Sequence, residues 1–374
     1  MSVDSIALAE ALINVPSVTP ASGEVFNVLE AALTPLGFTV HRWVMGEPPD
    51  GPTENIVAIR GEGGPHFGFA GHLDVVPAGE GWNGDPFAGE IVDGLLVGRG
   101  ANDMKSAIAA YVAAVSRIGP TQGTLSLLIT GDEEGYATWG TPRIIDWLNE
   151  RNIRPDMILI GEPTSVDRLG DTVKIGRRGS VNMWIEVPGV QGHVAYPHRA
   201  TNPIPPLARV ISALDSLHLD DGTEQFPPSN LEFTAISTPT NASNVIPGSA
   251  TAQLNIRFNN LQSGADLVKM VEEIAEREAP GSTVKARISG EAFLTPPGPL
   301  YDVVVAAIEE ETGAKPELST SGGTSDGRFL IQLCPVVDFG LPNATMHKVG
   351  ECAAVQDIET LSRIYEQIVR KVIG

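Results

Sequence analysis

The sequence predicts an α/β protein in which one domain has a mixed, largely parallel sheet flanked by helices, and a ferredoxin-like α+β domain is inserted into it. In the first 160 residues short β-like runs alternate with helical runs, which is typical of βαβ units. From about residue 179 the strands instead alternate apolar and polar positions, in the order β-α-β-β-α-β of a ferredoxin-like sandwich. We therefore expect an outer domain of residues 1–178 and 293–374 and an inserted domain of residues 179–292.

Apolar spacing and breaker residues predict the individual elements. In the outer domain they are helices at 3–14 and 23–35, strands at 55–60 and 66–70, a helix at 104–118, a strand at 124–130, a helix at 141–150, a strand at 157–160, and further segments from 300 to 372 that end in a long amphipathic helix. In the inserted domain they are strands at 180–187, 231–236, 250–258 and 283–288 and helices at 205–217 and 265–278.

Composition narrows the class of protein. The 374 residues are 42% apolar, enough for a substantial core. The net charge of −21 argues against a general affinity for nucleic acid or anionic membrane, which requires a basic surface. Two cysteines, Cys334 and Cys352, cannot form a disulfide framework, and no apolar run reaches the ~18 residues of a membrane span. Because no basic and apolar leader is visible either, we expect a cytoplasmic protein.

Four short polar motifs recur at a regular interval. His72 and Glu133 follow predicted strands, Glu162 follows a third, and Asp103 precedes the predicted helix at 104–118. The intervals between them are 31, 30 and 29 residues, and one βαβ step takes roughly 30 residues. We therefore expect each motif to lie at the carboxyl end of a successive strand, the edge where open α/β sheets bind ligands.

These residue types suit a metal site. In an extended chain His72 and Asp74 point to the same face, and a carboxylate beside a histidine holds its ring for metal binding. Mixed histidine and carboxylate ligands suit zinc, and a bridging carboxylate holds two ions about 3.5–4 Å apart. His347 is a candidate for the second histidine, whereas His41 and His66 are expected to pack within apolar strands and His218 to lie at the end of a helix. Taken singly, each motif could instead be a surface pair, a helix cap or a solvated turn.

The motifs together resemble the di-zinc aminoacylase and carboxypeptidase superfamily. They are Gly71-His-Leu-Asp-Val-Val-Pro77, Arg99-Gly-Ala-Asn-Asp-Met-Lys105, Thr130-Gly-Asp-Glu-Glu-Gly135, Gly161-Glu-Pro-Thr164 and Met346-His-Lys-Val349. The departures are Leu73, where the motif often has threonine, and Asn102 and Ser106, at positions that are usually small. The resemblance implies a di-zinc peptidase-like catalytic domain and an inserted dimerisation (lid) domain.

The resemblance also implies roles for particular residues. It gives each subunit two Zn²⁺ ions, with Co²⁺ as a substitute; the ligands of the first are His72, Asp103 and Glu162, and those of the second are Asp103, Glu134 and His347. The implied catalytic residues are Glu133 as general base, Asp74 as the residue that orients His72, and His193, which reaches the site of a partner subunit in a homodimer.

Four stretches, at 175–180, 189–198, 244–247 and 321–328, favour a member of the superfamily that hydrolyses the amide of an N-acyl amino acid carrying three carboxylates. The residues that match substrate-binding positions are Arg178, Asn244, Arg257, Thr324 and Asn343. Arginine side chains suit this role because they bind carboxylates through two parallel hydrogen bonds. The main alternative is a deacetylase or another N-acyl amino acid amidase of the same superfamily.

A more distant alternative is a serine hydrolase. Gly323-Thr-Ser325-Asp-Gly327 fits the nucleophile-elbow pattern, and Asp338 and His347 follow in the order of that class. The elbow requires a buried strand directly before the serine, however, and the segment before Ser325 is polar and rich in glycine. This alternative also leaves the four spaced motifs without a function.

Overall fold

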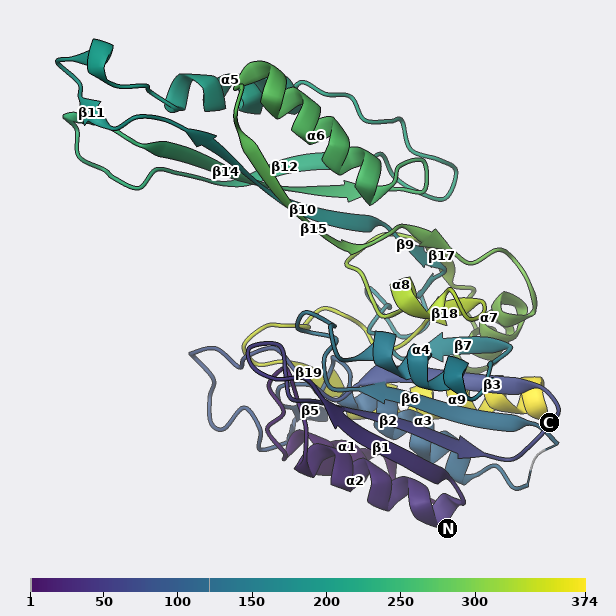
Figure 1. The fold of residues 1–374 in the computed structure, drawn as a ribbon. Helices are drawn as coiled ribbons and strands as arrows, with labels where there is room; N and C mark the ends of the chain where they lie inside the picture. Colours follow the sequence, from purple (N-terminus) through teal and green to yellow (C-terminus); the bar gives the residue numbers. More distant parts are fainter. Residues whose placement is uncertain (1, 121) are drawn as a thin grey trace. The chain divides into compact units, whose positions relative to one another are not determined.

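The computed structural model describes residues 2–120 and 122–374, and the chain divides into two compact units (Figure 1). Unit 1 runs to Ile175 and continues with Thr295–Ser319 and Ser325–Gly374. Unit 2 comprises Gly176–Leu294 and Thr320–Thr324. The short segment 320–324 was expected in the outer domain, but in unit 2 the guanidinium of Arg177 donates to the carbonyl oxygen of Gly323 at 2.9 Å. The connections at 176–177 and 293–294 also belong to unit 2, because they pair as the antiparallel strands β9 and β16.

The sheet of unit 1 has eight strands in the order β1-β2-β6-β3-β7-β18-β8-β17. Their bounds are β1 Thr39–Met45, β2 Thr53–Arg60, β3 His66–His72, β6 Thr124–Thr130, β7 Met157–Ile160, β8 Thr172–Lys174, β17 Glu317–Ser319 and β18 Val336–Asp338. The central strands β6, β3, β7 and β18 are mutually parallel, and β1 and β2 are antiparallel at one edge. This is the mixed, largely parallel sheet that the sequence predicts.

Helices cover both faces of this sheet (Figure 1). They are α1 Ser5–Ile13, α2 Glu24–Leu33, α3 Lys105–Ser116, α4 Thr141–Glu150, α7 Pro299–Thr312, α8 Gly327–Leu330 and α9 Val355–Ile373, with the short helix η1 at Thr34–Leu36. On one face Phe69 of β3 stacks on Tyr111 of α3, with ring centroids 4.1 Å apart. On the other face the side chain of Asn55 in β2 donates to Trp139, just ahead of α4. Because α3 is apolar on all sides, it lies buried between α1 and α9.

A small sheet beside the main one consists of β4 Glu90–Val92, β5 Leu95–Val97 and β19 Cys352–Ala354, in the order β19-β5-β4. The sequence interpretation missed β4, β5 and β19, because strands of three residues carry no readable alternation. It also missed β1, whose side chains are half-buried or exposed at the sheet edge and so show no apolar run. The predicted helices and strands that precede residue 161 otherwise match observed elements to within a few residues.

Unit 2 contains an antiparallel sheet in the order β12-β14-β10-β15. Its elements are β10 Gly179–Pro188, α5 Ile204–Asp215, β12 Asn230–Ser237, β14 Ser249–Phe258, α6 Gly264–Glu278 and β15 Thr283–Gly290, with the short pieces β9 Gly176–Arg177, β11 Gly192–His193, η2 Pro197–Arg199, β13 Val245–Ile246 and β16 Phe293–Leu294. Chain order and sheet order together give the ferredoxin-like topology, as predicted.

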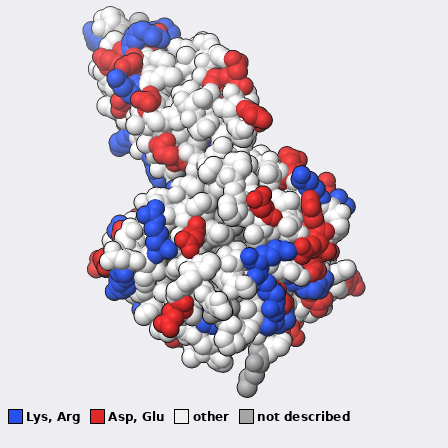
Figure 2. All heavy atoms as spheres, turned by 90° about the vertical axis from the view of Figure 1, so that its right-hand side faces the viewer, with Lys and Arg blue, Asp and Glu red and all other residues white. Residues whose placement is uncertain are grey.

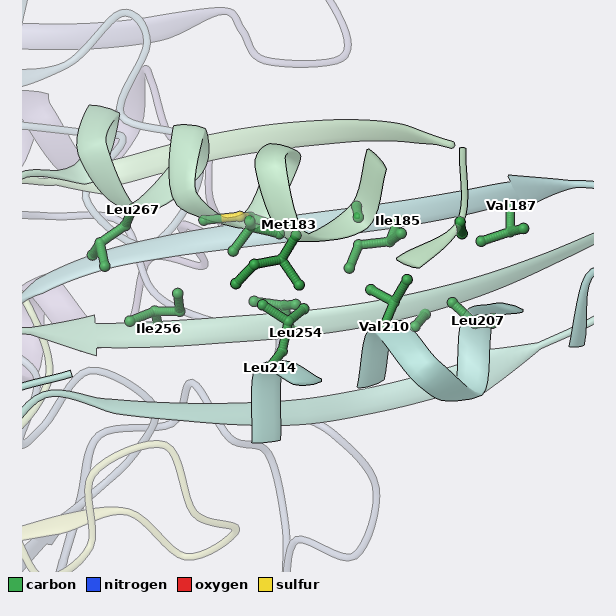
Figure 3. Packing of buried hydrophobic residues seen from close by; sticks show 14 of the residues in the cluster. Met183, Ile185, Val187, Leu207, Val210, Leu214, Leu254, Ile256 and Leu267 are labelled. Carbon is green, nitrogen blue, oxygen red and sulfur yellow. The ribbon is translucent and has the colours of Figure 1, made fainter. Parts of the chain in front are cut away.

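Alternation along the strands creates the core of unit 2. In β14 every second residue is buried, and β10 contributes Met183 and Ile185 to the same layer. Leu254 of β14 and Val210 of α5 face them, and Leu267 of α6 lies in the same layer (Figure 3). One face of the sheet is thus closed by two amphipathic helices, and the polar alternate positions lie on its other face.

Acidic and basic side chains occur together on the molecular face seen in Figure 2. That face therefore shows both signs of charge, although the chain as a whole is strongly acidic. Among the described residues, no helix combines the length and the apolar character needed to cross a membrane.

Candidate metal centre

The parallel strands bring three of the four motifs to one edge of the sheet of unit 1. β3 ends at His72, Glu133 and Glu134 follow β6 after a short turn, and Glu162 follows β7. Since β6, β3 and β7 are adjacent and parallel, their carboxyl ends meet. The expectation for Asp103 was wrong in one respect: it follows β5 of the small sheet and leads into α3, not a strand of the main sheet.

Two glycines bring Asp103 to the same edge. A Cβ atom at Gly71 would lie 2.5 Å from Cε of Met104, and one at Gly161 would lie 2.7 Å from it. Glycine immediately before His72 and before Glu162 therefore makes room for Met104 between β3 and β7. Because Met104 follows Asp103 directly, its packing carries Asp103 to the ends of these strands.

The side chain of Asp103 lies between two histidines. Its Oδ1 is 3.1 Å from Nε2 of His72, and its Oδ2 is 3.2 Å from Nε2 of His347. His72 is also 3.7 Å from Oε1 of Glu162, and His347 is 2.9 Å from Oε1 of Glu134. The five proposed ligands thus form two groups that share one carboxylate.

Asp74 holds two parts of the site together. Its backbone carbonyl accepts a hydrogen bond from Nδ1 of His72 at 2.9 Å, while its carboxylate lies 3.5 Å from the same nitrogen. The carboxylate accepts the backbone N–H groups of Glu133 at 3.2 Å and Glu134 at 3.0 Å. The sequence predicted only a contact with His72, and the structure adds a direct bond from Asp74 to the glutamate loop.

The charges of the site stabilise one another. Burial disfavours the charge on Asp103, but hydrogen bonds from His347 and His72 outweigh it and hold the pKa of Asp103 well below its usual range. Hydrogen bonds to Asp103 and Glu134 raise the pKa of His347 to about 10. Burial, with Asp326 as the next cause, raises the pKa of Glu133 to about 8. The site therefore places a strongly anionic carboxylate, Asp103, near a carboxyl, Glu133, that is poised to take a proton.

The donor set fits divalent metal ions. The donor atoms of His72, Asp103 and Glu134 lie within 4.8 Å of one another, as do those of His72, Glu133 and Glu162. Imidazole and carboxylate donors without a thiolate suit catalytic rather than structural zinc. A carboxylate with one oxygen toward each histidine suits a pair of ions. Glu134 belongs to the first of these groups and Glu133 to the second.

The family model of peptidase family M20/M25/M40 matches residues 68–371, a span that contains His72, Asp103, Glu134, Glu162 and His347. The chain belongs to this family. It is 61% identical over 371 residues to a succinyl-diaminopimelate desuccinylase of Zymomonas mobilis, with 99% of each chain covered. It is 59% identical to one of Rhizorhabdus wittichii, covering 100% of this chain and 99% of the relative. The M20 family metallo-carboxypeptidase Sso-CP2 of Sulfolobus solfataricus has the same fold, at 15% identity, a TM-score of 0.81 and 99% coverage of each chain.

Two of the predicted substrate-binding residues of this M20-family chain, Asn343 and Thr324, lie in different units. Asn343 lies in unit 1, where its backbone N–H donates to the carbonyl of Ser165, three residues after Glu162. Thr324 lies in the 320–324 segment of unit 2. The structure thus brings Asn343 to the loop that carries a predicted ligand.

In unit 2 the other predicted residues form two pairs. Arg178 donates to the side chain of Asn230 at 2.9 Å, and Asn230 is the strand partner of Arg257. Burial, and then the charge of Arg178, lower the pKa of Arg257, so the two guanidinium groups are neighbours. At the end of β10 remote from Arg178, exposed His193 lies beside exposed Asn244, whose carbonyl accepts the N–H of Val194 at 3.1 Å.

The geometry of the M20-family fold argues against the serine-hydrolase alternative, and also against a cysteine nucleophile. Ser325 is fully buried, and its hydroxyl donates to Asp338 at 2.9 Å. No strand precedes it directly, since β17 ends at Ser319. Burial raises the pKa of the Cys334 thiol to about 12, which keeps it protonated and unreactive.

Sequence reasoning missed two residues of the centre, Arg99 and Glu351. Both are almost completely buried, and they form an ion pair at 2.6 Å. A signal was present: Glu351 is a lone acid four residues after His347, directly before the apolar residues of β19. A charged residue at such a position requires a partner.

Proposed function

We propose that this chain hydrolyses the amide bond of N-succinyl-LL-2,6-diaminopimelate to succinate and LL-2,6-diaminopimelate, a step of diaminopimelate and lysine biosynthesis in the cytoplasm. The observation that carries the proposal is the placement of Asp103 between His72 and His347, in a chain that is 61% identical over its full length to a succinyl-diaminopimelate desuccinylase. A metal-dependent amidohydrolase needs such a centre.

We assign the metal ligands as two groups. His72, Asp103 and Glu162 would hold one Zn²⁺, and Asp103, Glu134 and His347 the other, with Co²⁺ as a substitute. The distances from Asp103 to both histidines support the shared carboxylate. Bound there, the two ions would polarise the amide carbonyl and lower the pKa of water.

Glu133 is the general base in this proposal. Burial raises the pKa of both glutamates, that of Glu133 to about 8, close to the operating pH. Glu134 is engaged by His347, because its Oε1 lies 2.9 Å from Nε2 of that histidine. Glu133 takes a proton from the attacking water and passes it to the nitrogen of the leaving amine. Asp74 fixes the backbone of both glutamates, which keeps the base in position.

The substrate carries three carboxylates, and the residues assigned to them are Arg178, Arg257, Asn244, Thr324 and Asn343. Arg178 and Arg257 support this role because they are half-buried neighbours of like charge. An anion bound between them relieves their repulsion and accepts several charge-assisted hydrogen bonds. The acyl group is then recognised by its free carboxylate, which an acetyl group lacks.

Side-by-side turnover of N-succinyl-LL-2,6-diaminopimelate and N-acetylornithine by the purified enzyme tests the substrate. We expect the succinyl compound to be preferred by about 10⁴-fold in kcat/KM, because a buried polar site strongly rejects a substrate that leaves its groups unpaired. Treatment with a chelator should abolish turnover, and added Zn²⁺ should restore it. Preference for N-acetylornithine would replace the substrate assignment, and full activity without metal would contradict the mechanism.

We also propose that the active enzyme is a homodimer. β10 separates the pair His193 and Asn244 from the pair Arg178 and Arg257, and a strand of ten residues is roughly 30 Å long. One small substrate cannot contact both pairs of the same subunit. His193 and Asn244 would therefore complete the site of a partner subunit, where His193 stabilises the oxyanion.

Complementation between inactive variants tests the dimer. H193A and E133Q should each be nearly inactive alone, whereas mixed and re-equilibrated subunits should recover up to about a quarter of wild-type turnover, because half of the dimers are mixed and each has one intact site. Sedimentation should show a dimer throughout. Absence of recovery from fully exchanged dimers, or a fully active monomer, would refute the shared site.

A further inference from the structure

Glu351 bonds directly to the backbone that carries Asp103. Its side chain is fully buried, and Oε1 accepts the backbone N–H groups of Asn102 at 2.8 Å and Asp103 at 3.0 Å. Its Oε2 accepts the guanidinium of Arg99 at 2.6 Å. One carboxylate thus binds three donors of the short segment 99–103, and the last of them belongs to the residue between the two histidines.

Glu351 also lies near the end of the turn that carries His347, directly before Cys352. His347 has a φ of +60°, a left-handed conformation that costs energy for a residue other than glycine, so the surrounding turn must hold it. Thr345 and Cys352 close this turn, because the threonine hydroxyl donates to the carbonyl of Cys352 at 2.7 Å. Cys352 then pairs with Val97 of β5, two residues before Arg99.

A second contact fixes the start of the same segment. The side chain of Asn102 donates to the carbonyl of Pro342 at 2.7 Å, directly before Asn343. The segment 342–351 is therefore fastened to residues 99–103 at its beginning by Asn102 and at its end by Glu351. His347 lies between the two attachment points.

Arg99 extends these contacts to the loop after His72. Its guanidinium donates to the carbonyl of Ala78 at 3.1 Å and lies over the ring of Trp82, 5.5 Å from its centroid. The buried pair of Arg99 and Glu351 consequently touches the loop after β3, the backbone of Asp103 and the His347 turn, three separate parts of the chain that converge on the centre.

We propose that Glu351 is a positioning residue for the metal pair: through the backbone of Asp103 and the turn of His347, it sets the separation of the shared carboxylate from the second histidine. The inference rests on the two-metal centre proposed above and concerns how tightly that centre binds metal. Groups that orient metal ligands in this way typically contribute 10- to 100-fold in metal affinity.

Zinc affinity of E351Q, measured by competition with a chromophoric chelator in the absence of substrate, tests the proposal. An amide has one acceptor oxygen in place of two and presents N–H donors to Arg99 or to the backbone, so we expect affinity to fall by about 10- to 100-fold. E351D keeps the charge on a shorter side chain and should lose less. E366Q is the matched control. Glu366 of α9 pairs with Arg117 and with Arg370, so this substitution should leave zinc affinity unchanged.

Circular dichroism and thermal unfolding of the metal-free proteins separate this role from general stability. Wild-type zinc affinity in folded E351Q, with only a lower melting temperature, would show that Glu351 is merely structural and overturn the proposal. If E351Q does not fold, E351D decides, because it must still bind zinc more weakly than the wild type. Wild-type protein that binds no zinc would instead contradict the metal centre itself.

Discussion

E133Q is expected to lower kcat by about 10²- to 10⁴-fold while both metal ions remain bound. The change removes only the group that accepts the proton, since an amide of the same size cannot do so at neutral pH. The backbone N–H of residue 133 still reaches Asp74, so the loop keeps its position. The measurement is steady-state turnover of N-succinyl-LL-2,6-diaminopimelate, together with elemental analysis of the same sample.

Metal content decides between the two roles open to Glu133. Its carboxylate lies close to His72 and Glu162, within the distance that a ligand would need. If E133Q loses one ion per subunit, Glu133 is a ligand and the general base is another group. E134Q is the informative comparison, because loss of the contact between Glu134 and His347 should weaken metal binding. Near-normal kcat in E133Q would remove Glu133 from the mechanism.

The spacing of the motifs predicted much of the centre because strand ends in a parallel sheet are fixed by topology. His72 ends β3, and Glu133 and Glu162 follow β6 and β7. These three strands are adjacent and parallel, so an interval of about 30 residues was sufficient to bring the residues together. Asp103 fits the same interval for a different reason: α3 and the packing of Met104 against Gly71 and Gly161 deliver it. The periodicity was therefore a correct guide to proximity, but a wrong guide to the element that supplies Asp103.

The parts that escaped the sequence analysis depend on contacts between distant segments. Glu351 and Arg99 are 252 positions apart, and neither belongs to a periodic pattern that would predict a buried ion pair between them. The bond from Asp74 to the loop of Glu133 and Glu134 likewise uses backbone groups, which a sequence does not display. Segment 320–324 joined unit 2 through a hydrogen bond to a backbone carbonyl. Side-chain types can be read from the sequence, whereas the partners of backbone donors and acceptors are known only from the folded structure.

Metal affinity should rise steeply with pH, because in the metal-free enzyme the histidines of the centre hold protons that the metal must displace. Hydrogen bonds to Asp103 and Glu134 raise the pKa of His347 to about 10. Burial opposes the charge on His72, but hydrogen bonds to Asp103 and Asp74 raise its pKa well above the usual value. Only neutral imidazole binds metal. Each displaced proton makes binding about tenfold tighter per pH unit below these pKa values.

Folding stability of the metal-free protein should change in the opposite direction. The pKa of His347 is higher in the folded chain than the unfolded value of 6.5, so its contribution is complete below pH 6.5 and is lost as the pH rises toward 10. The melting temperature without metal should therefore fall over this range, while zinc affinity increases.

Calorimetry of zinc binding in buffers of different ionisation enthalpy counts the protons that the metal releases. H218N is the control, because exposed His218 pairs only with Asp221 among the described residues and should alter neither slope. A zinc affinity independent of pH would mean that the histidines are already neutral in the metal-free protein, and it would contradict this prediction.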